Sequence, residues 1–281
     1  MNATQQVVRR AGESKAFATS AAILVVVTVL TFAVPWLSPN TYEQTDFDST
    51  LQAPATSGMH WFGTDELGRD LLVRTMQGTQ VTLLVAIVAS IVSLIIGVLY
   101  GATAGFIGGK VDAMMMRFVD TLYAMPFIFF VILLMVVFER NFLLMFVAIG
   151  AVNWLDMARI VRGQTLSLRE REFVAAARLN GVSTPRILLR HIAPNLFGIV
   201  IVYATLTIPQ AILVESFLSF LGLGIQEPQT SLGALVHGGV EQMEQASWML
   251  LIPGALLALI LLCCNFLGDG LRDVFDVRRR Q

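Results

Sequence analysis

The chain has 281 residues and a formal net charge of -1, with 56% hydrophobic and only 14% charged residues. Since about a quarter of the residues in a soluble domain are charged, this composition indicates a membrane protein. The near-neutral charge argues against a nucleic-acid partner, because a duplex binder needs a concentrated positive surface. The only cysteines, Cys263 and Cys264, are adjacent in an apolar run, which predicts packing residues rather than a disulfide or a metal site.

Residues 1–15 are polar and contain three basic residues, which predicts a cytoplasmic N-terminal segment. Residues 16–37 carry no charge and are long enough to cross the hydrocarbon core, which takes about 20 apolar residues. A cleaved signal peptide is the alternative for such a start. The run is long, however, and has no clear cleavage site before Pro35, so we expect an uncleaved first transmembrane helix.

Residues 38–74 are polar and acidic, and we expect them to form a periplasmic segment. Within them, residues 60–70 read HWFGTDELGRD, where glycine, aspartate and arginine follow closely on one another. This composition predicts a tight, internally bonded turn that leads into the next helix.

The core domain, residues 75–277, contains five more apolar stretches, which brings the predicted number of transmembrane helices to six. They cover roughly residues 75–109, 113–138, 142–160, 196–221 and 248–267. With both termini in the cytoplasm, sixteen of the 19 lysines and arginines fall on that side, including those of a basic tail, residues 278–281. This bias follows the positive-inside rule and supports an even number of spans.

An enzyme would need reactive groups that converge on one place, and the pattern predicts none. The three histidines, His60, His191 and His237, fall in three different segments, and the loop serines lack a nucleophile-elbow pattern. The glycine-rich run GATAGFIGG follows no strand and precedes no GK[ST] sequence, so it predicts close helix packing and a turn rather than phosphate binding. We therefore expect no catalytic residue and no metal site.

The one long polar stretch of the core, residues 161–195, is predicted to be a cytoplasmic loop of two short helices. The sequence SLRE at residues 167–170 has the capping-box pattern that opens a helix, and Gly181 stands where this helix stops. Thr184 caps the second helix, with a proline at its first helical position, and Pro194 limits it.

The first of these loop helices is predicted to carry an apolar face formed by Phe173, Val174 and Ala177. Charged residues surround its start: Arg169, Glu170, Arg171 and Glu172. The three alanines at residues 175–177 give part of the helix surface only small side chains. Such a helix would fit into the groove of another protein.

Three acids lie within or at the ends of the spans, where an ionised carboxylate is costly unless it is paired or lines a wet path. Asp156 is predicted to pair with Arg159 or Arg162, which follow within two turns. Asp120 is expected to pair with the arginine one turn earlier, the alternative being a wet path. Glu215 has no partner nearby in the sequence, and two readings stay open: it faces the interior cavity or a partner subunit, or it bonds to an adjacent helix of this chain.

Residues 172–195 resemble the cytoplasmic EAA loop of the membrane subunits of ATP-binding-cassette (ABC) importers. That loop has three small residues, a glycine four positions after the last of them, and a proline thirteen positions after the glycine. These positions hold Ala175, Ala176, Ala177, Gly181 and Pro194. The family's leading glutamate is replaced by Ala175, so its polar contact is either lost or supplied elsewhere, for example by Glu172 one turn earlier.

Other stretches narrow the resemblance to the peptide and nickel permease family, and most closely to the C subunits of bacterial oligopeptide permeases. They are WFGTDELGRDLL (61–72), GGKVDAMMMRFVD (108–120), WLDMARIVRGQTLSLREREF (154–173), ESFLSFLGLGIQEP (215–228) and NFLGDGLRD (265–273). One departure is Leu232, where a tryptophan is usual.

The resemblance implies an all-α membrane protein of the type I ABC importer permease fold, with six transmembrane helices and cytoplasmic termini. It implies residence in the bacterial inner membrane among lipid, with no role for nucleic acid. It also implies a heterodimer with a homologous permease subunit and a periplasmic or lipid-anchored peptide-binding protein. Two cytoplasmic ATPase subunits would bind ATP and Mg, while this chain would bind no cofactor.

The same resemblance implies an ATPase-coupling interface within the loop: Arg169, Glu170, Arg171, Glu172, Ala175, Ala176, Ala177, Gly181 and Pro194. Candidates for the translocation path are two acids and two prolines that interrupt helical hydrogen bonding: Asp120, Pro126, Pro209 and Glu215. Dipeptides, nickel or another small cargo are alternatives to oligopeptides. A stand-alone secondary transporter, driven by ions through Asp120 and Glu215, is the rival from another class.

Overall fold

The computed structural model of the chain describes residues 15–55, 60–126, 129, 131–133, 137 and 142–276. These residues form helices and connecting loops, with one isolated β-bridge between Thr64 and Asp70. Four of the described helices are long and apolar enough to cross a membrane: α2 (Lys15–Leu37), α3 (Leu71–Ile107), the continuous helix Thr184–Phe220, and α11 (Trp248–Asp276) over its first 26 residues.

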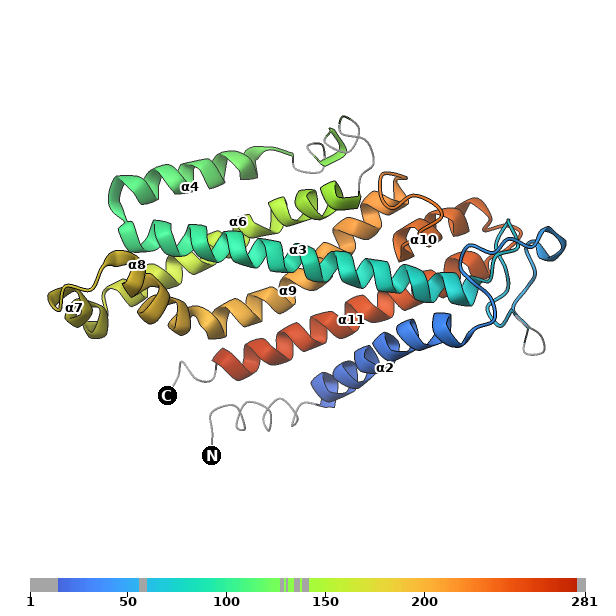
Figure 1. Ribbon diagram of the computed structural model, residues 1–281, viewed down its shortest axis with the longest axis horizontal. Helices are drawn as coiled ribbons and strands as arrows, with labels where there is room; N and C mark the ends of the chain where they lie inside the picture. Colours follow the sequence, from blue (N-terminus) through green and yellow to red (C-terminus); the bar gives the residue numbers. More distant parts are fainter. Residues whose placement is uncertain are drawn as a thin grey trace.

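The long helices lie side by side, with α3 in the middle (Figure 1). It packs mainly against α6 (Phe142–Arg169) and α9 (Ala193–Phe220), while α11 packs against α2, α9 and α10 (Leu232–Glu241). On the other side of α3 and α6 lies α4 (Gly109–Ala124). The short helices α7 (Glu172–Leu179) and α8 (Thr184–Ile187) lie at one end of the bundle, and α10 lies toward the other end with the loop that precedes α3.

Most of the predicted apolar stretches coincide with these helices. The stretches beginning at residues 16, 142 and 248 fall within α2, α6 and α11, and those beginning at residues 75 and 196 coincide with α3 and α9 except for their last one or two residues. The stretch 113–138 is different: α4 ends at Ala124, Met125 is extended ahead of Pro126, and most of the remainder lies outside the described residues. The count of six spans therefore stays a prediction.

Close packing of α3 on α6 depends on glycines at every fourth position of α3, namely Gly97, Gly101 and Gly105. A Cβ atom at Gly101 would lie 2.3 Å from the backbone oxygen of Ala158, and one at Gly105 would lie 2.7 Å from that of Arg162. Small residues at this spacing let two helix backbones approach, which is a common device in membranes. The packing role predicted from the GATAGFIGG run is confirmed for Gly101 and Gly105.

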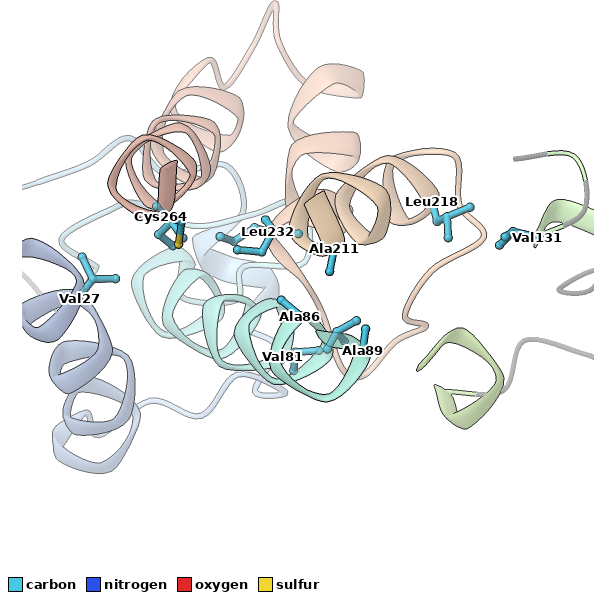
Figure 2. Close-up of a cluster of buried hydrophobic side chains, with 12 residues drawn as sticks. Val27, Val81, Ala86, Ala89, Val131, Ala211, Leu218, Leu232 and Cys264 are labelled. Atoms are coloured by element: carbon cyan, nitrogen blue, oxygen red, sulfur yellow. The ribbon is translucent and has the colours of Figure 1, made fainter. Parts of the chain in front are cut away.

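A large buried cluster joins five helices in the half of the bundle near α10. Figure 2 shows part of this cluster: Val27 from α2, Val81, Ala86 and Ala89 from α3, Ala211 and Leu218 from α9, Leu232 from α10, and Cys264 from α11. Cys263 and Cys264 are both buried and are not joined in a disulfide, as expected of packing residues. Leu232, where the resemblance leads one to expect tryptophan, is fully buried at 0% exposure.

Candidate functional site

The first loop helix, α7, begins later than the sequence predicts. The SLRE pattern at residues 167–170 does not open a helix, because α6 continues to Arg169 and α7 starts at Glu172. The last turns of α6 still pack on α3, and the Arg169 Nη1 donates to the Gly105 carbonyl at 3.3 Å. The predicted capping box is therefore wrong, since tertiary packing outweighs a local capping preference.

The end of α7 is where the sequence places it. Gly181 has a positive φ of 72°, its N–H donates to the Arg178 carbonyl, and the Val182 N–H donates to the Ala177 carbonyl. These two bonds define a Schellman motif, in which the left-handed residue after the helix is usually glycine. The predicted stop at Gly181 is confirmed.

The second loop helix is not a separate helix, so the limit predicted at Pro194 is wrong. Its N-cap is Ser183 rather than Thr184, and a π-helical turn, Leu188–Ile192, leads from α8 directly into α9. In this turn the N–H of the residue before Pro194 bonds to the Leu188 carbonyl, five residues back. The π turn shifts the hydrogen-bond register just before a residue that has no N–H to donate, so the helix runs on through the proline.

One face of α7 is anchored in the bundle. Val174 and Ala177 are buried in a cluster with Ile187 and Ile192 from the second loop helix and Phe106 from the end of α3. The Arg178 guanidinium lies 5.0 Å from the centroid of the Phe106 ring, which adds a cation–π contact. The predicted apolar face is correct for Val174 and Ala177.

The opposite face of α7 points away from the bundle. Ala175 and Ala176 are exposed, and Phe173, predicted to share the buried face, is 39% exposed instead. Phe173 lies on the rim of the buried face, where its ring stands 6.5 Å from that of His191. Two leucines are also largely exposed, Leu179 on α7 at 90% and Leu189 in the π turn at 70%. These five residues, 173, 175, 176, 179 and 189, are called the α7 surface below.

Ion pairs tie the α7 end of α6 to α4. The Arg162 guanidinium donates from Nε to one Asp112 oxygen at 2.5 Å and from Nη2 to the other at 2.7 Å. Such bidentate pairs fix geometry as well as charge. Beyond them, the Arg169 Nε donates to Glu170 at 3.1 Å. The pairing of Arg162 with Asp112 could not be predicted from the sequence, because the partners are far apart along the chain.

The acids of the spans find partners other than those predicted. Asp120 accepts a bond from the Arg159 Nη2 at 2.6 Å, not from the arginine one turn earlier on α4. Asp156 accepts a bond from the Tyr123 hydroxyl. The predicted direct pair of Asp156 with Arg159 or Arg162 is wrong, although the charge of Arg159 still acts on Asp156. Packing of α4 beside α6 offers each of these groups a bonded partner across the helix interface.

Glu215 is fully buried and bonds to other residues of this chain. Its carboxylate accepts bonds from the Thr82 hydroxyl of α3 at 3.1 Å and from the Ser219 hydroxyl at 2.7 Å. Thr82 also accepts a bond from the Leu232 N–H at 3.2 Å, so the group joins α3, α9 and α10. Of the two readings open for Glu215, bonding to an adjacent helix is confirmed. Pro209 is buried within α9.

The predicted tight turn at residues 60–70 is confirmed, and its core is charged. Arg69 donates from Nε to Asp65 at 2.7 Å and from Nη2 to Glu227 at 2.9 Å. Arg74 lies within 3.5 Å of the same two acids. We call these four residues the outer ion-pair network. Asp70 caps α3 by accepting a bond from the backbone of the third helical residue.

The outer ion-pair network lowers the pKa of Glu227 below its ordinary value. The main cause is the hydrogen bond from Arg69, and the charges of Arg69 and Arg74 act in the same direction against a smaller effect of burial. Glu227 stands in the loop between α9 and α10, so its ionised form holds this loop to the turn that precedes α3.

Within the part of the chain that the structure describes, no three histidine, cysteine, aspartate or glutamate side chains lie close enough to hold a metal ion. Of the residues predicted for coupling, those from Arg169 to Ala177 lie at the end of α6 and on α7, Gly181 follows α7, and Pro194 lies in the first turn of α9. The path candidates are not brought together: Asp120 and Pro126 lie on or next to α4, while Pro209 and Glu215 are buried in α9.

Comparison with known proteins assigns nearly all of the chain. Residues 93–281 match the family described as binding-protein-dependent transport system inner membrane component. Residues 2–54 match the N-terminal transmembrane domain of oligopeptide transport permease C.

Three curated relatives are each named oligopeptide transport system permease protein OppC. The protein of Escherichia coli is 52% identical over 272 residues, which is 97% of this chain and 90% of the relative. That of Haemophilus influenzae is 51% identical over 276 residues, or 98% and 89% of the two chains. That of Bacillus subtilis is 38% identical over 259 residues, or 92% and 84%. The chain therefore belongs to the family of inner-membrane permease components of binding-protein-dependent transport systems.

Proposed function

We propose that this chain is the C-type permease subunit of an ATP-driven importer that carries oligopeptides across the bacterial inner membrane. It pairs with a homologous permease subunit to enclose the path, and receives peptide from a periplasmic or lipid-anchored binding protein. Two cytoplasmic ATPase subunits bind ATP and Mg, and this chain binds neither. The names of its relatives and their coverage of almost the whole chain support this assignment.

The observation that carries the proposal is the α7 surface. Val174 and Ala177 fix α7 to the bundle, while the exposed Ala175 and Ala176 give its outward side only small side chains. A groove on an ATPase subunit can accept a helix with such a side, and the exposed Phe173 and Leu179 supply apolar contacts at its edge. The charged residues 169–172 and Gly181 and Pro194 complete the proposed coupling interface.

Six transmembrane helices with cytoplasmic termini are part of the proposal. The positive-inside bias of the lysines and arginines supports this orientation. It places α7 in the cytoplasm and the outer ion-pair network in the periplasm, at opposite ends of the bundle (Figure 1). Asp120, Pro126 and Pro209 remain proposed contributors to the path or its bending. Glu215, which is buried and bonded to Thr82 and Ser219, would act on the path only through the position of α9.

Uptake in proteoliposomes tests the function. Vesicles that hold the complete complex and binding protein are expected to import a labelled oligopeptide only with ATP. The same vesicles are also given a labelled dipeptide or nickel, and the cargo that accumulates inside them distinguishes the alternatives. Uptake by this chain alone under an ion gradient would refute the ATP-driven assignment in favour of a secondary transporter.

A further inference from the structure

Four polar side chains form one exposed group across α4 and α6. Asp120 and Tyr123 come from α4, and Asp156 and Arg159 from α6. Arg159 bonds to Asp120 and stacks on Tyr123, with its guanidinium carbon 4.0 Å from the ring centroid. The side chains of Asp120 and Arg159 are 58% and 43% exposed, and Asp156 is also exposed. We call these four residues the α4–α6 polar face.

The α4–α6 polar face rests on a packed base. Val119, Trp154 and Ala158 are buried directly beneath it, and the Tyr100 ring meets Trp154 edge-on with centroids 5.0 Å apart. The Tyr100 hydroxyl also donates to the Met115 carbonyl of α4 at 2.9 Å. This packing holds α4 against α6 beneath the polar groups.

In the proposed topology, the position of this face along the helices argues against contact with lipid tails. Asp120 lies about 16 Å along α4 from its first residue, at 1.5 Å per residue, and the hydrocarbon core is about 30 Å thick. An exposed ion pair and a second carboxylate at such a depth are costly against hydrocarbon and mark a wet path or a protein interface. The face is thus turned toward the inside of the assembly.

The charges of the face do not balance. Arg159 is the one cation among these four residues: it bonds to Asp120, and its charge also acts on Asp156, which accepts its hydrogen bond from the neutral Tyr123 hydroxyl. The next arginine along α6, Arg162, is held by both oxygens of Asp112. One carboxylate charge is left over, which favours a cationic group in front of the face.

We propose that the α4–α6 polar face is a wall of the translocation path that takes the α-ammonium group of a passing peptide, with Asp156 as its acceptor. This inference rests on the proposed function, because it requires that peptides pass through this subunit. Arg159 bonds to Asp120 and stacks on Tyr123, so one guanidinium is shared by two carboxylates and the face keeps a formal charge of -1. A peptide with a blocked amino group loses this contact.

Charged thiol reagents test the face in the assembled complex. In a Cys263→Ala/Cys264→Ala background, Ala124→Cys places a thiol one turn beyond Asp120, at an exposed position, and leaves all four polar residues intact. Inside-out vesicles receive a cationic (trimethylammonium-ethyl) or an anionic (sulfonatoethyl) methanethiosulfonate. We expect the cationic reagent to react faster. Adding Asp156→Asn should reduce this preference about fivefold, the effect of one unit charge roughly 8 Å away in water.

Three further arms make the outcome specific. Val25→Cys on α2 is an exposed apolar control and is expected to react with neither reagent. Trialanine in excess should slow the modification of Ala124→Cys, and N-acetyl-trialanine should not. Met125→Cys, also exposed, serves as a second reporter if the first variant does not assemble.

Equal rates with both reagents, or a preference that survives Asp156→Asn, would overturn the proposal. A thiol that reacts with neither reagent would overturn it in favour of an interface covered by another subunit. Failure of the proposed function is distinguishable from either result, since in that case the unmodified complex itself would not import peptide with ATP.

Discussion

Gly181 ends α7 in a conformation that few other residues adopt. Its φ of 72° lies in the left-handed region, and a Cβ atom there would meet no neighbour within 4 Å. Substitution therefore costs backbone strain alone, about 1–2 kcal/mol for alanine and less for asparagine. Gly181→Ala is expected to weaken ATP-driven uptake and Gly181→Asn to preserve most of it, as measured by peptide accumulation in vesicles.

A matched control for Gly181 is Gly163→Ala. Gly163 is a helical glycine of α6 with open space around its Cβ position and no positive φ, so alanine should leave uptake unchanged. If Gly181→Ala and Gly181→Asn behave alike, the left-handed conformation of this residue has no part in coupling.

Glu172 is the residue placed to supply the acid that the EAA-loop resemblance leads one to expect at the position of Ala175. Both residues are exposed, and they lie three positions apart on α7, which makes them neighbours on the helix surface. Glu172→Gln is expected to lower ATP-driven uptake about tenfold, as for a lost bond to a charged group worth about 1.5 kcal/mol. Ala175→Glu in the same chain should restore it. No recovery in the double variant would show that the two positions are not equivalent.

The contact between α3 and α6 depends on the glycine at position 101. Because a Cβ atom there would lie 2.3 Å from the Ala158 backbone oxygen, Gly101→Ala must push the two helices apart. Overpacking of this kind costs about 1–3 kcal/mol. Thermal unfolding of the purified subunit should show a lower midpoint for Gly101→Ala, and no loss for Gly238→Ala on α10, where nothing lies within 4 Å. Equal midpoints would contradict the tight packing of α3 on α6.

The outer ion-pair network should make the loop between α9 and α10 sensitive to acid. Arg69 lowers the pKa of Glu227 in the folded chain, so ionised Glu227 contributes stability in full above the pKa of an unfolded glutamate, about 4.3. This contribution is lost as the pH falls through the lower, folded pKa. Glu227→Gln should remove that part of the pH dependence of the unfolding midpoint, and an unchanged profile would contradict it.

The sequence predicts the helices well because their apolar stretches are long, and it predicts the stop at Gly181 because a single residue type marks it. The wrong predictions concern helix ends that are set by packing between helices rather than by local sequence. The capping pattern at residues 167–170 is overridden by the contact of α6 with α3, and a π turn carries the second loop helix through Pro194. Neither event leaves a local mark in the sequence.

Side-chain pairs of the site are the part least accessible from the sequence. Asp120, Asp156 and Arg162 each have charged residues one or two turns away, yet each bonds to a residue on another helix. Local spacing predicts which pairs are possible within a helix, whereas the register between α4 and α6 decides which ones form. That register follows from the packing of all the helices together.

A single helix connects the two ends of the molecule. Thr184–Phe220 is one continuous helix of 37 residues, about 55 Å long at 1.5 Å per residue. It runs from the buried cluster that holds α7 to the buried hydrogen bonds of Glu215. Its first turns pack on Val174 and Ala177, so a displacement of α7 acts directly on this helix. We expect the assembly to switch as a population shift driven by ATPase contacts at the α7 surface.

The role of α7 in coupling is tested most directly by Ala176→Arg in the reconstituted complex. The quantity to measure is the number of peptides imported per ATP hydrolysed. Ala176 is exposed at the centre of the α7 surface, so arginine should leave the subunit folded in the membrane but prevent the close approach of the ATPase. The ratio is expected to fall at least about tenfold, which corresponds to a loss of about 1.4 kcal/mol of coupling, while the Gly163→Ala control keeps the ratio of the unmodified complex. An unchanged ratio for Ala176→Arg would contradict the role of α7 in coupling.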